Sequence, residues 1–259
     1  MTSFVTAVIL TLNEADDLPA CLAAIPKALP VLVLDSGSTD ETLDIARAAG
    51  ATVRDRRWTG FADQRNFALR SCGVETPWVL FVDADERYPP SFFDWMAKIL
   101  PQDPPVDVFE VPSRLFLDGG ALWFAPGYPV LHPRLVRRAA VSFTPNHAGH
   151  GETVASARTA RSPIAYDHYF QAGDLYPWLQ KHLRLAEADA RAHAAPTSRR
   201  GRLAAQLGRG PMRALARFVY HYVLRGGFLD GGPGLRYALM YTWYELTAHL
   251  IWRSRGGRR

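Results

Sequence analysis

The stretch WVLFVDADE, Trp78 to Glu86, decides the fold. It opens with the apolar run Trp78 to Val82, and a short, bulky, partly β-branched run is typical of a strand buried on both faces. Residues two apart on a strand share a face, so we expect the carboxylates of Asp83 and Asp85 to lie side by side. Adjacent carboxylates repel each other unless a cation lies between them, and Mg²⁺ is commonly held by one or two carboxylates plus substrate phosphates.

An ordinary strand exit is the alternative interpretation of these residues. In that case Asp85 or Glu86 faces water, and Pro89-Pro90 simply starts a helix. The residues upstream bear on the choice, because they alternate between strand and helix patterns. Apolar runs predict further strands at 4–10, 31–34 and 51–54, and helical patterns cover about 15–24, 38–50 and 61–71. This alternation implies right-handed crossovers, so the predicted fold class is α/β, with a mostly parallel sheet and helices on both faces.

Polar segments follow three of the predicted strands, at the edge where parallel sheets bind ligands. These three segments are Thr11–Glu14, Asp35–Asp40 and Asp83–Glu86. A fourth polar segment, Gly60–Asn66, opens a predicted helix. Each has a local interpretation: Asn13 and Ser38 are good helix caps, and Asp-Ser-Gly-Ser is a good turn. Because the fold brings all of them to one edge of the sheet, together they favour a binding site.

These segments resemble a known family. The sequences VLDSGSTDET, GFADQRNFAL and FVDADE, within residues 3–100, are similar to the nucleotide-sugar-binding half of family 2 glycosyltransferases, which have the inverting GT-A fold. More narrowly, the chain resembles the bacterial lipopolysaccharide-core β-glucosyltransferase branch. That branch carries DSGSTD, a W-x-G-F-x-x-Q-x-N-x-A-L segment matched from Trp58 to Leu69, and a GFLDG element matched from Gly227 to Gly231.

The resemblance implies roles for residues of the donor site. Asp35 would bind the uracil or ribose of a UDP-sugar, and Thr11 and Glu14 would line the same pocket. Arg65 would contact the base or a phosphate, with Asn66 helping to hold it. Asp85, together with Asp83, would coordinate Mg²⁺ or Mn²⁺ on the diphosphate, where the metal neutralises charge on the leaving group.

Inversion requires one general base on the acceptor side. In relatives a His-Glu pair follows an arginine-rich strand; here that strand is 132–138, and the pair is split as His150-Gly151-Glu152. We take Glu152 as the base, with His150 beside it. His147 and Asp118 are further candidates, and two other interpretations stay open. In the first interpretation, the segment that contains His147, His150 and Glu152 is only a surface turn. In the second, these three residues bind a metal ion.

The domain organisation follows a change in composition along the chain. Residues 1–100 form the donor half, residues 101–170 the acceptor half, and residues 171–259 a helical, basic and aromatic region. Between Ala190 and Leu229 there are eight arginines and no acidic residue, which indicates an anionic partner surface. We expect a lipid-linked or saccharide acceptor and a peripheral position on the cytoplasmic face of the inner membrane. No signal peptide is expected, because Met1 to Leu12 lacks a basic start.

A helix after Pro211 carries Leu215, Phe218, Val219 and Tyr222 on one side and Arg213 and Arg217 on the other. This pattern predicts a helix that lies in a lipid interface with its arginines near headgroups. Alternatively, the apolar stripe packs on the catalytic domain and the arginines face water. A spanning helix at 235–252 is disfavoured, because charged residues such as Arg236 and Glu245 interrupt it.

Two other functions fit parts of this sequence. A nucleotidyltransferase also uses a parallel sheet and a metal, but it usually needs a glycine- and arginine-rich phosphate loop near its first strand, which this chain lacks. A nucleic-acid-binding protein could use the arginines of 190–225, but it gives no reason for the acidic strand ends and shows no recognition motif. No nucleic-acid partner is therefore expected.

Overall fold

The computed structural model describes residues 4–145, 152–154, 158–171, 175–191 and 210–255. The chain divides into two compact units, which are described separately. The first consists of Met1–Arg114, Val130–Pro145 and Gly151–Tyr169, and the second of Leu115–Pro129, Asn146–His150 and Phe170–Arg259. The division at 100 and 170 inferred from composition stays a prediction.

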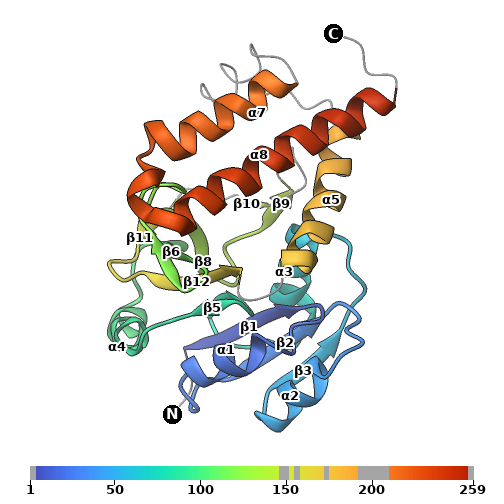
Figure 1. Ribbon diagram of the computed structural model, residues 1–259. Coiled ribbons are helices and arrows are strands. Elements are labelled where there is room, and N and C mark those ends of the chain that lie inside the picture. Colours follow the sequence, from blue (N-terminus) through green and yellow to red (C-terminus); the bar gives the residue numbers. More distant parts are fainter. Residues whose placement is uncertain (1–3, 146–151, 155–157, 172–174, 192–209, 256–259) are drawn as a thin grey trace. The chain divides into compact units, whose positions relative to one another are not determined.

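The first unit begins with four parallel strands in the order β3-β2-β1-β4. Figure 1 shows β1, β2 and β3 next to one another in blue, at the start of the chain. The strands are β1 (Val5–Thr11), β2 (Val31–Asp35), β3 (Thr52–Asp55) and β4 (Trp78–Asp83). The helices are α1 (Leu18–Ala24), α2 (Thr42–Ala48), α3 (Phe61–Ser71) and α4 (Pro90–Ile99), which leads into the 3₁₀ turn Leu100–Gln102.

Helices cover both faces of this sheet, as predicted. Ala7 and Ile9 of β1 lie in a buried cluster with residues of α1, α2 and α4. Val8, between them in the sequence, lies in a second cluster with residues of α3. Successive strand residues point to opposite faces, so α3 covers one face, and α1, α2 and α4 cover the other.

The prediction of a mostly parallel sheet is wrong beyond β4, and the sheet is mixed. Strand β8 (Val130–Arg137) runs antiparallel to β4, and β6 (Val108–Leu117) runs antiparallel to β8. No crossover helix lies between β6 and β8, and parallel neighbours need such a crossover. The remaining strands are β5 (Glu86–Arg87), β9 (Phe143–Pro145), β10 (Glu152–Val154), β11 (Thr159–Arg161) and β12 (Tyr166–Gln171).

The second unit is mainly helical. The end of β6 pairs with β7 (Gly120–Leu122). The helices are α5 (Leu175–Arg191), α7 (Pro211–Phe218) and α8 (Gly231–Ser254). Two shorter elements lie between α7 and α8, the π-helical turn η2 (Val219–Leu224) and the 3₁₀ turn η3 (Gly227–Asp230). Its core contains Leu117, Leu122, Trp178, Tyr237 and Met240. Among the helices of the described ranges, none combines the length and the apolarity needed to cross a bilayer.

The orientation of α7 contradicts the packed alternative, and the interfacial helix stays a prediction. The side chains of Arg213 and Arg217 are about one-third exposed, and both guanidinium groups bind the carboxylate of Glu245 on α8. Leu215 and Val219, which were expected to be covered if the helix packed on a domain, are exposed. One acidic residue on the neighbouring helix therefore reverses the usual rule that the apolar stripe of a helix faces the core.

Candidate functional site

Strand register brings the predicted donor residues to one edge of the first unit. Thr11 of β1 lies opposite Asp35 of β2, and Leu10 lies opposite Asp83 of β4. The three strands run parallel, so their carboxyl ends meet at the same edge. The predicted convergence of the motifs after β1, β2 and β4 is therefore confirmed in the geometry of the sheet.

Asp35 is fully buried and organises the turn that follows β2. Its Oδ1 accepts hydrogen bonds from the hydroxyls of Thr11 (2.8 Å) and Ser38 (2.6 Å). Its Oδ2 accepts bonds from the backbone N–H groups of Gly37 (2.8 Å) and Ser38 (2.7 Å). Burial raises the pKa of Asp35, but these hydrogen bonds, led by those of Ser38, outweigh it and hold the pKa below its usual value. The carboxylate is therefore a fixed negative charge at the strand end.

Asp35→Asn keeps the size of the side chain but removes this charge and part of its accepting capacity. UDP affinity should fall by about 1.5–3 kcal/mol, the range for a hydrogen bond to a charged group. Stability should fall at neutral pH as well. Because the folded-state pKa is depressed, the stabilisation by Asp35 is present above the unfolded pKa and disappears as the pH falls through the folded value.

The measurement is UDP titration calorimetry, together with urea unfolding at pH 7 and pH 3. The difference in stability between the variant and the wild type should be largest at pH 7 and smaller at pH 3. Unchanged UDP affinity with lowered stability would assign Asp35 to the turn alone.

The segments after β1 and β2 are joined by side chains. Asn13 has a left-handed backbone (φ 56°), and its Oδ1 accepts the N–H of Thr39 at 2.8 Å. The N–H of Glu14 donates to the hydroxyl of Thr42 at 2.8 Å. The predicted caps are wrong: α1 begins at Leu18, and α2 begins at Thr42 after Glu41. Asn13 fixes one loop against the other instead, which places Glu14 beside the Asp35 turn.

The α3 residues of the motif are buried. Arg65 is 2% exposed; its Nη2 lies 3.3 Å from Oδ1 of Asp83, and its guanidinium carbon lies 4.8 Å from the centre of the Phe81 ring. The amide of Asn66 both donates to the carbonyl of Phe143 (2.8 Å) and accepts its N–H (2.9 Å). Asn66 thus anchors β9, and any role of either residue in donor binding stays a prediction.

Asp83 is 32% exposed and joins a charge cluster whose other members, Arg65, Arg134 and Glu86, are buried. Its Oδ2 accepts a hydrogen bond from Arg134, and the same Nη2 of Arg134 donates to the fully buried Glu86. Burial raises the pKa of Asp83, but Arg134 and Arg65 lower it more strongly, and the carboxylate is ionised. Burial also raises the pKa of Glu86, to about 7, against the opposing effect of Arg134. The alternative in which Glu86 faces water is wrong.

Asp85 lies in a different environment from Asp83. Strand β4 ends at Asp83, so Asp85 lies in the following turn, and the strand argument that placed the pair side by side does not apply. The Asp85 side chain is 29% exposed, and Nε2 of His168 lies 3.1 Å from its Oδ2. Burial lowers the pKa of His168, but Asp85 outweighs burial and raises it overall. Strand β12 brings His168 here by pairing with Glu86 of β5.

The carboxylates at this edge fit a divalent cation that is completed by a ligand. No described group of three or more His, Cys, Asp or Glu side chains is arranged to hold a metal ion. A cation would therefore take most of its ligands from phosphate oxygens and water, as Mg²⁺ commonly does. The two side chains are about equally exposed, at 32% for Asp83 and 29% for Asp85. Both oxygens of Asp83 are bound by arginines, whereas the charged neighbour of Asp85 is His168, so Asp85 fits the cation better.

The predicted base lies mostly outside the described residues. His147 and His150 are outside them, and of Glu152 only the backbone, which starts β10, is described. Asp118, another candidate, pairs with Arg236 in the second unit. The sequence patterns assign no role to Arg134, Glu86 or His168. The signal for Arg134 was its place in the strand HPRLVRR, where an arginine between apolar residues points to a buried charge.

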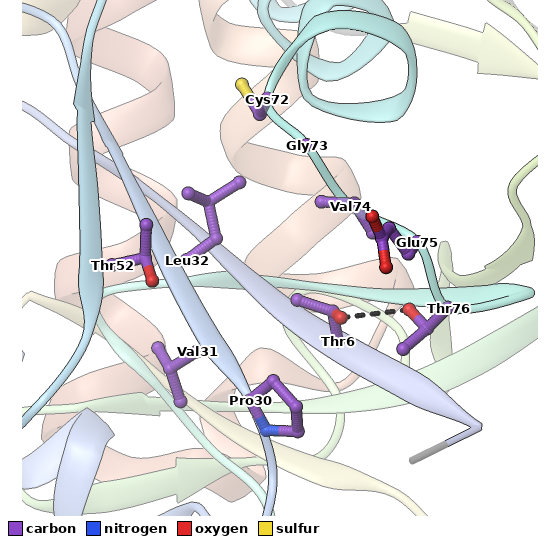
Figure 2. Close-up of a pocket in the computed structure, with 10 residues that line it drawn as sticks. All are labelled: Thr6, Pro30, Val31, Leu32, Thr52, Cys72, Gly73, Val74, Glu75 and Thr76. Atoms are coloured by element: carbon purple, nitrogen blue, oxygen red, sulfur yellow. Dashed lines mark hydrogen bonds between the residues drawn. The ribbon is translucent and has the colours of Figure 1, made fainter. Parts of the chain in front are cut away.

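A hollow in the first unit lies at the opposite edge of the sheet. Figure 2 shows it, lined by Thr6 and Leu32 near the amino ends of their strands and by the Cys72–Thr76 segment. Its volume is about 230 Å³, and the hydroxyls of Thr6 and Thr76 hydrogen-bond across it at 2.8 Å. Glu75 is the single charged residue of its lining, so this hollow is not the acidic site.

Comparison with known proteins shows the family to which the chain belongs. The model of "Glycosyl transferase family 2" matches residues 6–142. The lipopolysaccharide core biosynthesis glycosyltransferase LpsC of Rhizobium meliloti (strain 1021) is 31% identical over 119 residues, covering 44% of this chain and 43% of LpsC. An uncharacterized glycosyltransferase of Mycobacterium tuberculosis (strain CDC 1551) is 40% identical over 81 residues, 31% of this chain and 36% of that protein. The chain thus spans less than half the length of these relatives.

Two solved structures share the fold. Residues 1–349 of S. aureus TarS, in complex with UDP-GlcNAc, match with a TM-score of 0.51 and 15% identity over 97% of this chain and 91% of that one. Glucosyl-3-phosphoglycerate synthase from Mycobacterium tuberculosis was solved with Mn²⁺, UDP and glucosyl-3-phosphoglycerate. It matches with a TM-score of 0.50 and 16% identity over 74% of this chain and 81% of the synthase chain. The mixed sheet is thus of the GT-A type, and with the family model covering more than half of its residues, the chain belongs to glycosyltransferase family 2.

Proposed function

We propose that this protein transfers a sugar from a UDP-sugar to a saccharide acceptor, with inversion and with a divalent metal. The observation that carries the proposal is the edge where the ionised Asp35 and the partly exposed Asp85 follow parallel strands. Structures of the same fold support the donor class, since TarS was solved with UDP-GlcNAc and the mycobacterial synthase with Mn²⁺ and UDP.

The residues of this edge have separate roles in the proposal. Thr11 and Glu14 line the nucleotide pocket, and Asp35 accepts hydrogen bonds from the uracil or ribose. Arg65, with Asn66 behind it, supplies positive charge next to the acidic motif. Asp85, supported by Asp83, holds Mg²⁺ or Mn²⁺ with the diphosphate oxygens. A cation bound there would neutralise the charge that develops on the departing nucleoside diphosphate.

The acceptor is proposed to be lipid-linked or part of a cell-envelope polysaccharide or lipopolysaccharide. The partial match to LpsC supports this class, because that relative is a lipopolysaccharide core biosynthesis enzyme by name. Such an acceptor would be met at the cytoplasmic face of the inner membrane. The basic composition of residues 190–225 supports an anionic surface as the partner.

Glu152 is proposed as the general base, because it lies where relatives carry their His-Glu pair. Glu152→Gln should lower turnover by roughly 10²–10⁴-fold, since general-base catalysis contributes that much, and should leave donor affinity unchanged. Steady-state transfer rates and UDP calorimetry give the two quantities. If Glu152→Gln keeps its activity and His150→Ala is inactive, the base is the histidine.

Titration calorimetry of the wild-type chain with UDP tests the proposed function directly. We expect UDP to bind more tightly with Mn²⁺ present than in EDTA, since the cation joins carboxylates to phosphates. Failure to bind UDP under both conditions would refute the donor assignment. Binding of duplex DNA without nucleotide binding would support a nucleic-acid-binding protein instead.

A further inference from the structure

Exposed apolar side chains are concentrated in the second unit. Nineteen large apolar side chains are exposed in the described ranges, and 16 of them belong to this unit. Single exposed apolar residues are ordinary on soluble proteins, whereas a gathering of them marks an interaction surface. The second unit therefore has a property that the first lacks.

Half of these 16 side chains form stripes on two helices that pack together. On α7 and η2 they are Met212, Leu215, Val219 and Val223, and on α8 they are Leu235, Leu239, Leu246 and Leu250. Both sets follow helical spacing. The residues that pack inward lie on other sides of the same helices, for example Ala214 and His221 below the first stripe and Tyr237 and Met240 below the second. We call the two stripes together the apolar face.

The arginines of α7 do not belong to this face. The Nε atom of Arg213 lies 3.0 Å from Oε2 of Glu245, and Arg217 donates to Oε1 of the same carboxylate. Glu245 is only 10% exposed, so both guanidinium groups are turned toward α8 and share one negative charge. They fix α7 to α8 and thereby hold Leu215 and Val219 outward. The stripe is exposed because of this ion-pair geometry.

An aromatic segment of the same unit has the composition of a membrane interface. Trp123, Phe124 and Tyr128 are exposed, and the rings of Trp123 and Tyr128 lie 5.1 Å apart. Asp230 holds this segment by accepting the backbone N–H groups of Trp123, Phe124 and Ala125. Tryptophan and tyrosine favour surfaces that are apolar on one side and wet on the other. The GFLDG element thus presents aromatic rings in a fixed arrangement.

The charge of the chain identifies the occupant of the apolar face. Residues 170–259 contain 15 Lys and Arg but five Asp and Glu, whereas residues 1–169 contain 15 Lys and Arg and 20 Asp and Glu. A second copy of the chain would bring two strongly basic segments together, which like-charge repulsion opposes. An anionic lipid surface matches both the positive charge and the apolar side chains.

We propose that the apolar face, with the aromatic segment 123–128, inserts into the interfacial layer of an anionic membrane. This deepens the proposed function and rests on its membrane-borne acceptor, because it names the surface that meets the lipid. Arg213 and Arg217 act as positioning residues inside the unit. The long-range attraction comes from the other basic residues of 170–259, and the apolar face supplies the contact that holds the protein on the lipid.

Sedimentation of the full chain with vesicles tests the proposal. Vesicles of phosphatidylcholine alone are compared with vesicles containing phosphatidylglycerol, at low and at high salt. Leu215→Gln and Leu239→Gln should each lower binding to the anionic vesicles about tenfold, since each removes a leucine from the apolar contact. Leu183→Gln, the same change at an exposed leucine of α5 outside the face, should leave binding unchanged. Thermal melts should not change, because all three side chains are exposed.

The outcomes separate the proposal from its alternatives. Binding that follows Leu215 and Leu239 and partly survives high salt would support insertion. A protein that stays in the supernatant with anionic vesicles at low salt would refute it, as would equal binding by all variants. A dimer in vesicle-free solution that Leu215→Gln dissociates would assign the face to a second copy. In UDP calorimetry the same variants should bind UDP as tightly as the wild type does. If the wild type itself does not bind UDP, the proposed transferase function is rejected, and the result on lipid binding stays valid.

Discussion

Asp85→Asn and Asp85→Ala are expected to lower sugar transfer by about 10²–10³-fold, the effect of removing one preorganised electrostatic contact from an active site. The side chain lies in a turn and is 29% exposed, so its loss should not disturb the core. Transfer is measured with Mg²⁺ and with Mn²⁺, and the fold is followed by thermal melting. Because the proposed cation joins Asp85 to the diphosphate, the difference in UDP affinity with and without Mn²⁺ should disappear as well.

Asp94 offers a matched control for this change, because it is an exposed aspartate on α4, after the motif. Asp94→Asn should transfer sugar at the wild-type rate. Asp83→Ala should be nearly as inactive as Asp85→Ala but for another reason, since it removes the counter-ion of Arg65 and Arg134. Its melting temperature should therefore fall, whereas that of Asp85→Ala should not. Full activity in Asp85→Asn with either metal would reject the metal assignment.

Local sequence patterns predicted the parallel half of the first unit well. The apolar runs at β1, β2 and β4 are strong because these strands are buried on both faces, and α3 was placed at its observed bounds. Once the strands are known, the convergence of Thr11, Asp35 and Asp83 follows from the geometry of parallel sheets. The resemblance to family 2 rests on the same residues, and the family model confirms it.

The residues around the acidic motif could not be predicted in the same way. Arg134 reaches Asp83 from β8, and His168 reaches Asp85 from β12, so each contact depends on antiparallel pairing between strands far apart in the sequence. No local period reports such pairing. The helix cap at Asn13 failed for a related reason, because the side chain bonds a loop that follows another strand.

Helix α7 shows a different limit of sequence reasoning. The helical period correctly separates Leu215 and Val219 from Arg213 and Arg217, but it does not say which side packs. That choice depends on Glu245, which lies on another helix and binds both arginines. A basic stripe packs inward only where a buried acid compensates it, and the sequence alone does not pair the two.

Arg134→Met is expected to lower the free energy of unfolding by about 3–5 kcal/mol, the range for removing one partner of a buried ion pair. Arg134 is 5% exposed and binds both Asp83 and Glu86, so the change removes the cation that these two carboxyl groups share in the interior. Methionine has a similar length and no charge, so packing is largely retained. Urea unfolding at neutral pH, followed by circular dichroism, gives the difference.

Arg138→Met is the control, because Arg138 is a half-buried arginine at the end of the same segment whose Nε donates to the carbonyl of Thr76. It should cost much less than Arg134→Met. The double variant Arg134→Met, Glu86→Gln separates charge from packing, because glutamine removes the fully buried carboxylate while Arg65 still compensates Asp83. If uncompensated charge is the cause, the double variant should recover part of the lost stability. A double variant no more stable than Arg134→Met would show that Arg134 stabilises the unit by packing, on Tyr166 for example, rather than by charge.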